Sequence, residues 1–115
     1  MEKNSKKEKE RKYLDTNIFY DLLNLNTGFD SPNIKYFSEA DFEIVLDRVQ
    51  RNGIGIWGIE PWQHGEFYEV TCCRETDDPT DPAWYFQAFQ DLKMMREILD
   101  YSATYSIPKR LLNNY

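Results

Sequence analysis

The stretch from Gly53 to Cys73 gathers most of the side chains that could do chemistry in this chain. It contains the only histidine, His64, and both cysteines, together with three glutamates close to the histidine in sequence: Glu60, Glu66 and Glu69. A carboxylate and an imidazole held together can bind a metal ion or transfer protons. The same histidine could activate a cysteine thiol as a nucleophile.

The spacing of these residues argues against a shared catalytic site. The pattern predicts a β-hairpin with strands over Ile54–Glu60 and Glu66–Arg74 and a turn over Pro61–Gly65. His64 then lies at the tip, whereas both cysteines lie near the far end of the return strand. At ~3.3 Å per strand residue, the thiols would be roughly 25–30 Å from the imidazole. We therefore assign no catalytic residue and expect a protein that is not an enzyme.

Cysteine usage points to a reducing compartment. Cys72 and Cys73 are adjacent, a spacing that strains a disulfide, and the chain has no other cysteine. A disulfide framework is excluded, which favours the cytoplasm. Ligand pairs with CxxC-like spacing and glycine-rich phosphate loops are both missing, so we predict neither a metal site nor a cofactor. We also expect no signal peptide and no transmembrane helix.

The strongest site prediction is an acidic and aromatic surface on the hairpin and the loop that follows it. Trp62 lies in the predicted turn, where a large side chain is hard to bury, and tryptophan often anchors protein interfaces. Carboxylates surround it and continue into the loop at 75–82. We predict a partner-binding surface made by Glu60, Trp62, Glu66, Glu69, Asp77 and Asp78. The alternative is that Trp62 folds under the helices and the carboxylates are only solvated.

Residues 12–23 read K-Y-L-D-T-N-I-F-Y-D-L-L. This stretch resembles the opening of PIN-domain nucleases, in which a strand ends in an L-D-T-N signature. The resemblance implies a metal-dependent ribonuclease with Asp15 as a metal ligand, but it ends after about a dozen residues. PIN domains open on an apolar strand, whereas Glu8–Lys12 is charged here, and their parallel sheet needs alternating strands and helices. From the residues alone, Asp15 is a candidate helix N-cap.

Charge is distributed unevenly along the chain. Residues 2–12 carry six Lys and Arg against three Glu, a net charge of +3, whereas residues 13–115 carry eight against seventeen Asp and Glu, a net charge of −9. A strongly acidic body repels phosphate backbones, so we expect no nucleic acid as a direct ligand. It would instead steer towards a basic protein partner. The alternative is that the negative charge only keeps the protein soluble and attracts no specific partner.

Hydrophobic periodicity predicts three helices and leaves the N-terminus unstructured. We predict a charged flexible tail over residues 1–12 and a single α+β domain over 13–115. The helices are expected over Tyr13–Leu25, over Ser38–Asn52 with Ser38 as N-cap and Gly53 after its end, and from Pro82 onwards with Asp81 as N-cap. The second helix shows a clear apolar stripe: Phe42, Val45, Leu46 and Val49.

The remaining strands complete a split βαβ pattern. Ile34–Phe37 and Tyr101–Ile107 join the two hairpin strands to give the order β-α-β-β-α-β after the first helix. The fold class is therefore α+β, a ferredoxin-like four-stranded antiparallel sheet with helices on one face. Ile34–Phe37 and Glu66–Arg74 would be its central strands. In the first hairpin strand, the inward face switches at Gly58, which predicts either a strand buried on both sides or a β-bulge.

In size, charge and lack of catalytic groups the chain is similar to the small acidic bacterial immunity proteins. That resemblance is one of type, without a shared motif, and it implies a protein that covers the active site of a basic, nuclease-type toxin. The leading hypothesis is therefore an acidic protein-binding module acting in the cytoplasm, without a membrane or nucleic-acid partner. The alternatives are a PIN-like ribonuclease using Asp15 and a small regulatory subunit that forms a homodimer through an exposed sheet edge.

Overall fold

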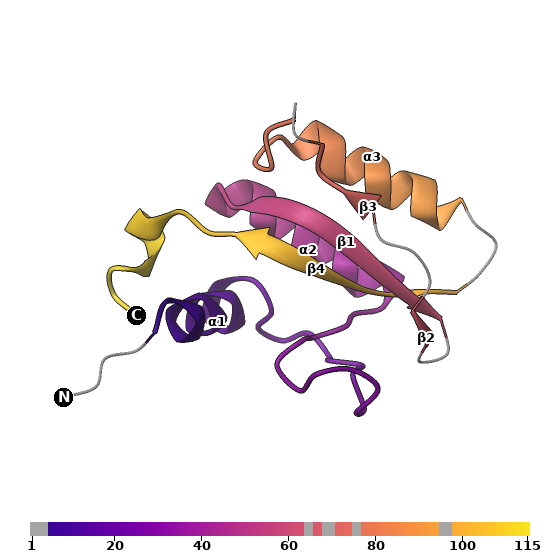
Figure 1. The fold of residues 1–115 in the computed structure, drawn as a ribbon, viewed down its shortest axis with the longest axis horizontal. Helices are drawn as coiled ribbons and strands as arrows, with labels where there is room; N and C mark the ends of the chain where they lie inside the picture. The colour runs from indigo at the N-terminus through magenta and orange to yellow at the C-terminus, as the bar shows by residue number, and fades with distance from the viewer. Residues whose placement is uncertain (1–4, 64–65, 68–70, 75–76, 95–97) are drawn as a thin grey trace.

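The fold is organised around one antiparallel sheet, and Figure 1 shows its computed structural model with strand β1 (Gly55–Gln63) in the middle. Strand β4 (Asp100–Ser106) pairs with one edge of β1. Strands β2 (Glu66–Phe67) and β3 (Thr71–Cys72) both pair with the other edge, as two pieces of the return strand of the predicted hairpin. The sheet is therefore three strands wide. The structure describes residues 5–63, 66–67, 71–74, 77–94 and 98–115.

A β-bulge interrupts β1, which is one of the two alternatives that the sequence left open at Gly58. The register against β4 shifts between Ile56 and Gly58. Ile56 and Ile59 lie an odd number of positions apart, so regular alternation would place them on opposite faces of the sheet. The bulge lets both side chains become fully buried, and it leaves Trp57 half exposed between them.

The predicted turn at Pro61–Gly65 is shorter than expected, because β1 continues through Pro61 as far as Gln63. Pro61 lies opposite Tyr101 of β4. The backbone N–H and C=O of Tyr101 bond instead to Phe37, at 2.8 Å each. Because the N–H and C=O of Tyr101 point away from β1, Pro61 and Tyr101 form a non-hydrogen-bonded pair. The proline therefore leaves no donor missing on this side of the strand.

The ferredoxin-like order was not found among the described residues. The predicted strand Ile34–Phe37 is reduced to an isolated bridge between Phe37 and Tyr101. In a ferredoxin-like sheet, the second and fourth strands lie at opposite edges, whereas here the corresponding β1 and β4 are direct neighbours. The hairpin strand β1 is central, and Ile34–Phe37 and Glu66–Arg74 are not. The α+β class holds.

Helices α2 (Glu39–Asn52) and α3 (Pro82–Lys93) pack together against the sheet. Each begins as predicted: the Ser38 hydroxyl accepts the Asp41 N–H at 3.2 Å, and the Asp81 carboxylate accepts the Ala83 N–H at 2.9 Å. Gly53 ends α2 with φ +71°, a left-handed conformation that glycine adopts without strain. Their apolar stripes meet β4 in the core, which includes Phe42, Val45, Leu46, Val49, Tyr85, Phe89 and Tyr101.

The first helix begins earlier than predicted. Helix α1 spans Lys6–Asn17, so residues 6–12 are helical where a flexible tail was expected, and residues 18–25 are not. A capping box at Ser5 and Glu8 explains the start: the Ser5 hydroxyl accepts the Glu8 N–H at 3.1 Å, and the Glu8 carboxylate accepts the Ser5 N–H at 3.2 Å. Residues 5–12 have almost no apolar periodicity, so the hydrophobic pattern gave no sign of a helix start at this pair.

Long-range contacts fix α1 beside β4. The Tyr13 hydroxyl donates to Asn52 at the end of α2 (3.1 Å), and the Asn17 amide donates to the Tyr115 hydroxyl (2.9 Å). Tyr115 follows a short 3-10 helix, η1 (Lys109–Leu112), that packs against α1. Figure 1 shows α1 below β4, on the side away from α3. None of the helices in the described part of the chain is long and apolar enough to cross a membrane.

Candidate functional site

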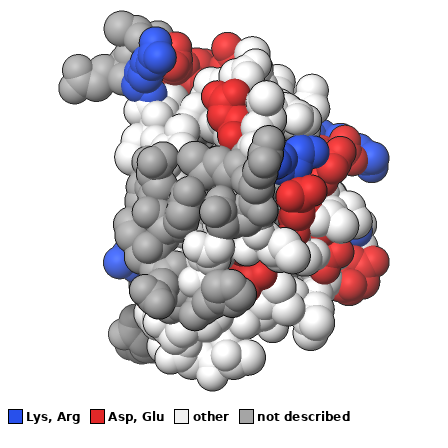
Figure 2. Space-filling model, turned by 90° about the vertical axis from the view of Figure 1, so that its right-hand side faces the viewer, with Lys and Arg blue, Asp and Glu red and all other residues white. Residues whose placement is uncertain are grey.

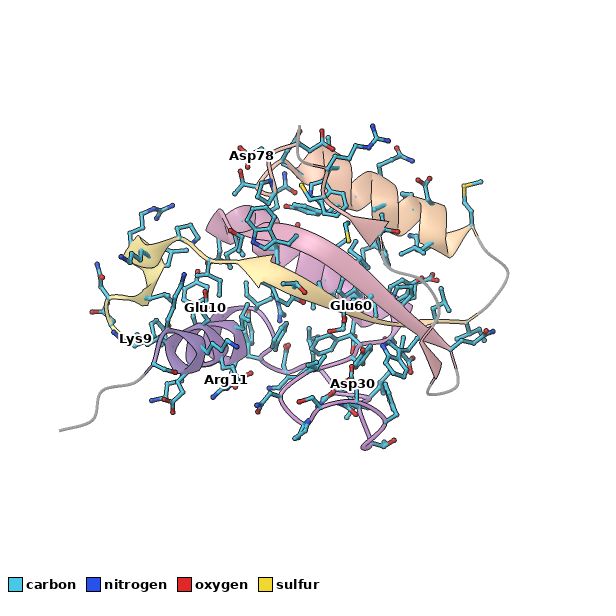
Figure 3. All side chains as sticks on the ribbon, in the orientation of Figure 1. Lys9, Glu10, Arg11, Asp30, Glu60 and Asp78 are labelled. Atoms are coloured by element: carbon cyan, nitrogen blue, oxygen red, sulfur yellow. The ribbon has the colours of Figure 1, made fainter. Side chains whose placement is uncertain are left out.

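The predicted partner-binding residues do not form one surface. Figure 3 places Glu60 midway along the sheet and Asp78 at its upper margin, close to the start of α3. The side chains of Glu66 and Glu69 lie outside the described residues, as does His64. The other four predicted residues fall in two separate regions, one around Glu60 and Trp62 and one around Asp77 and Asp78.

Trp62 is half-buried against the loop before α2, and not under the helices as the alternative interpretation of the sequence held. Its ring lies 5.0 Å from the ring of Phe29 and 5.5 Å from that of Tyr36, centroid to centroid. The loop before α2 therefore covers this end of β1. The Asn26 side chain shapes the loop by donating to the carbonyls of Asp30, Ser31 and Ile34, at 3.3, 2.9 and 2.8 Å. Trp62 is thus held as part of an aromatic cluster.

Glu60 lies beside this aromatic cluster in a half-buried position. Burial raises the pKa of Glu60, and the hydroxyl of Thr104 at 3.4 Å opposes the shift. Tyr36 is fully buried and donates its hydroxyl to Asp30 at 2.6 Å, and burial together with that hydrogen bond raises the tyrosine pKa. Phe29 and Asp30 lie between the helix expected over Tyr13–Leu25 and the strand expected over Ile34–Phe37, and no local pattern marked them as site residues.

The second region is a hollow of about 370 Å³ between β3 and α3, which we call the acidic hollow. Asp77, Asp81 and Asp91 line it, along with Arg74 and Trp84. The indole N–H of Trp84 donates to the Ile56 carbonyl at 3.1 Å, which fixes one wall. Three carboxylates against one guanidinium leave this hollow with an excess of negative charge. Asp77 is the predicted site residue that lies in it.

Neighbouring groups shape the loop that carries Asp77. Asp78 accepts the N–H and the hydroxyl of Thr80 at 2.9 and 2.7 Å, and these bonds lower its pKa. Cys73 is partly buried at this loop, where desolvation first and the charges of Asp77 and Asp78 next raise the pKa of its thiol. A raised pKa keeps the thiol protonated and unreactive near neutral pH.

The carboxylates on the face shown in Figure 2 do not form a continuous patch. Figure 2 shows Asp and Glu side chains in several patches with Lys and Arg between them. Among the described residues, Arg51 forms an ion pair with Asp47, and Lys93 forms one with Glu43. A partner would therefore meet local acidic patches rather than a uniformly negative surface.

Asp15, the residue implied by the PIN-domain resemblance, lies on the exposed side of α1 and forms an ion pair with Lys35. It is a residue of the last helical turns and neither caps the helix nor ends a strand. Within the described part of the chain, no group of three or more His, Cys, Asp or Glu side chains could hold a metal ion. The surroundings of Asp15 therefore give the nuclease hypothesis no support.

A third region was not anticipated from the sequence. A hollow of about 320 Å³ runs along the outer edge of β4, between that strand and α1, and its lining includes Leu14, Phe19, Ile34, Ala103 and Tyr105. A smaller hollow of about 230 Å³ shares Leu14 and Tyr105 with the first. The residues that it adds are Lys7, Glu10, Thr104 and Ile107. The two share lining residues, and we call them together the β4 groove.

No protein-family model, curated protein or solved structure matched the chain in the comparisons with known proteins.

Proposed function

We propose that this chain is a small acidic protein-binding module of the immunity or inhibitor type, which binds a basic partner in the cytoplasm. The observation that carries this proposal is the acidic hollow, where Asp77, Asp81 and Asp91 surround a concave site beside Trp84. A hollow of this size fits a lysine or arginine side chain. The carboxylates would attract its charge, and the indole ring is a suitable surface for a cation.

The charge of the whole chain supports the same partner. A net charge of −6 would speed the approach of a basic protein and would make that approach sensitive to salt. If the partner is a nuclease, carboxylates of the hollow would take the place of substrate phosphates. Trp62, packed between Phe29 and Tyr36, would then stabilise the sheet and would not serve as the exposed anchor that the sequence suggested.

The test uses the full chain immobilised as bait for proteins from its native cytosol. The informative variant is Asp77→Asn with Asp91→Asn, which removes two charges from the hollow but keeps Asp81, the N-cap of α3. Glu39→Gln with Glu43→Gln is the matched control, because it removes two charges from α2. Two exposed ion pairs together are worth about a factor of ten in affinity.

The proposal requires a basic protein that both the unaltered chain and the α2 control retain. The hollow variant should retain it about tenfold more weakly, and salt should release it in every case. A basic protein held equally well by all three chains would place the interface elsewhere. The absence of any captured basic protein at low salt would contradict the function itself.

A further inference from the structure

The outer edge of β4 carries backbone groups without partners. Tyr101 directs its N–H and C=O outwards to Phe37. Backbone directions alternate along an antiparallel strand, so Ala103 and Tyr105 also direct theirs outwards. The hydrogen bonds of β1 support the same direction for Tyr105. Ile56 lies opposite Tyr105, and its N–H points away from β4 and donates to the Pro79 carbonyl. In the described part of the chain, the outward groups of Ala103 and Tyr105 form no hydrogen bond.

The groove exists because the chain leaves the sheet edge at this point. Continuing the ladder from Phe37 would place residues 35 and 33 opposite Ala103 and Tyr105. Asn33, Ile34 and Lys35 instead line the far wall of the hollow, facing β4 across about 320 Å³ of open space. The N–H and C=O groups of Ala103 and Tyr105 are therefore open to a ligand in the groove, beside the apolar side chains of Leu14 and Phe19. Unpaired edges of this kind accept an added strand.

The lining of the β4 groove carries a small net positive charge, whereas the whole chain has a net charge of −6. Arg11 and Lys7 lie on its α1 wall, and Figure 3 shows Arg11 well away from Asp78, the sequence neighbour of Asp77 in the acidic hollow. Lys35 is neutralised by Asp15, but no ion pair holds Arg11 or Lys7 among the described residues. The segment that contains α1 carries the chain's excess of positive charge. Three cations, Lys7, Arg11 and Lys35, line the groove together with two carboxylates, Glu10 and Asp15. The net charge of +1 beside an apolar floor favours an anionic segment with alternating apolar residues.

We propose that the β4 groove binds an extended anionic segment of a partner protein, which adds to the outer edge of β4 as a further strand. The segment would bond to Ala103 and Tyr105 through alternate residues. Its apolar side chains would contact Leu14 and Phe19, and its carboxylates would approach Arg11. The edge is recessed between α1 and residues 32–35, so a single extended segment reaches it more easily than the sheet of a second copy. This surface is separate from the acidic hollow.

The probe is an acetylated and amidated hexapeptide of alternating valine and glutamate with a fluorescent label, titrated with the full chain and followed by anisotropy. We expect binding below ~1 mM, with amide chemical-shift changes at Ala103 and Tyr105. The corresponding valine–lysine peptide should bind at least about tenfold more weakly. Two N-methylated peptides test the hydrogen bonds, one methylated at the odd-numbered residues and one at the even-numbered residues. Only one edge of the peptide meets β4, so one of these peptides should lose binding and the other should keep it.

Variants of the chain test the same contacts. Arg11→Glu should weaken binding about threefold to tenfold, whereas Lys12→Glu, the same change of charge one position along α1, should leave it unaltered. Ala103→Pro removes an outward donor and no bond to β1, so it should abolish binding while the chain stays folded by circular dichroism. If Ala103→Pro unfolds, the N-methylated peptides test the same hydrogen bonds.

Three results would overturn the proposal. One is no binding of the valine–glutamate peptide at 1 mM, a concentration at which even a weak strand-addition site is half occupied. Another is equal weakening by Arg11→Glu and Lys12→Glu, which would indicate attraction to net charge without a groove. The third is a concentration-dependent dimer that Ala103→Pro dissociates, which would make a second copy the occupant.

Discussion

Arg48 joins the end of α1 to α2 through several contacts of one side chain. One guanidinium nitrogen donates to the carbonyls of Ile18 and Tyr20, at 3.0 and 2.9 Å. The other pairs with Asp21 at 3.2 Å, and the guanidinium carbon lies 3.9 Å from the centroid of the Tyr20 ring. Only 15% of the Arg48 side chain is exposed. The two carbonyls would lose these partners if the side chain were removed.

Arg48→Met should therefore lower the free energy of unfolding by about 1–3 kcal/mol, mainly because the part-buried carbonyl of Ile18 would lose its donor. Arg51→Met is the matched control on the same helix. Arg51 is 73% exposed and makes only an i, i+4 pair with Asp47, so its loss should cost less than about 0.5 kcal/mol. Urea denaturation measures both values. Equal costs for the two variants would show that the contacts of Arg48 contribute nothing.

Glu60 should make stability depend on pH in an unusual direction. Its folded-state pKa lies above its ordinary value of 4.5, so the folded state binds the proton more tightly than the unfolded state. The stability that this carboxyl contributes is therefore complete below pH 4.5 and is lost as pH rises through the folded pKa. Glu60→Gln should be more stable than the unaltered chain at pH 8 and equal to it near pH 4.

Chemical denaturation at the two pH values checks this, with the exposed Glu39→Gln as a control that should change stability by less than about 0.5 kcal/mol. A constant difference between Glu60→Gln and the unaltered chain at both pH values would point to packing rather than to titration.

At the scale of the element, the capping box decides where α1 begins. Ser5→Ala removes the hydroxyl that accepts the Glu8 N–H and should destabilise the first helical turn by about 1 kcal/mol. Amide hydrogen exchange should then accelerate over residues 6–9. Residues near Tyr13, which are tied to α2 through Asn52, should keep their exchange rates. Unchanged exchange over residues 6–9 would mean that the capping box does not hold the helix start.

The loop that carries Asp77 depends on a close backbone approach at Gly55. A Cβ at this position would lie 2.8 Å from the carbonyl carbon of Pro79 and 2.9 Å from its oxygen. Pro79 also accepts the Ile56 N–H at 2.9 Å, so the loop is bonded to β1 where no side chain fits. Gly55→Ala should cost about 1–3 kcal/mol in thermal or urea unfolding. A stable Gly55→Ala variant with its loop contacts intact would contradict this explanation.

Local signals in the sequence predicted some elements well, and long-range contacts decided the others. The caps at Ser38 and Asp81, the stripe of α2 and the bulge near Gly58 are local patterns, and all are present. The strand order depends on the β1–β4 pairing, which no local pattern encodes. The β4 groove was missed for the same reason: Arg11 and Ala103 lie far apart in sequence, and only the fold brings them to one groove.

At the scale of the whole molecule, two surfaces of opposite sign lie apart. The acidic hollow lies between β3 and α3, and the β4 groove lies between β4 and α1. We expect the two to act independently, because sites without shared partners usually contribute additively. Asp77→Asn with Asp91→Asn should leave the affinity for the valine–glutamate peptide within about twofold, and Arg11→Glu should leave capture of the basic partner unchanged. Coupling greater than this would show that the surfaces communicate.

The bulge in β1 gives the protein an intrinsic optical probe. It leaves the Trp57 side chain 50% exposed, while Trp62 is packed among aromatic rings and Trp84 donates a hydrogen bond within the fold. Iodide in solution should therefore quench the emission of Trp57 selectively. The remaining, shielded emission comes from residues at the two ends of the folded sheet. Tryptophan emission recorded with and without iodide can therefore distinguish a change around Trp57 at the surface of β1 from a loss of the packing around Trp62 and Trp84.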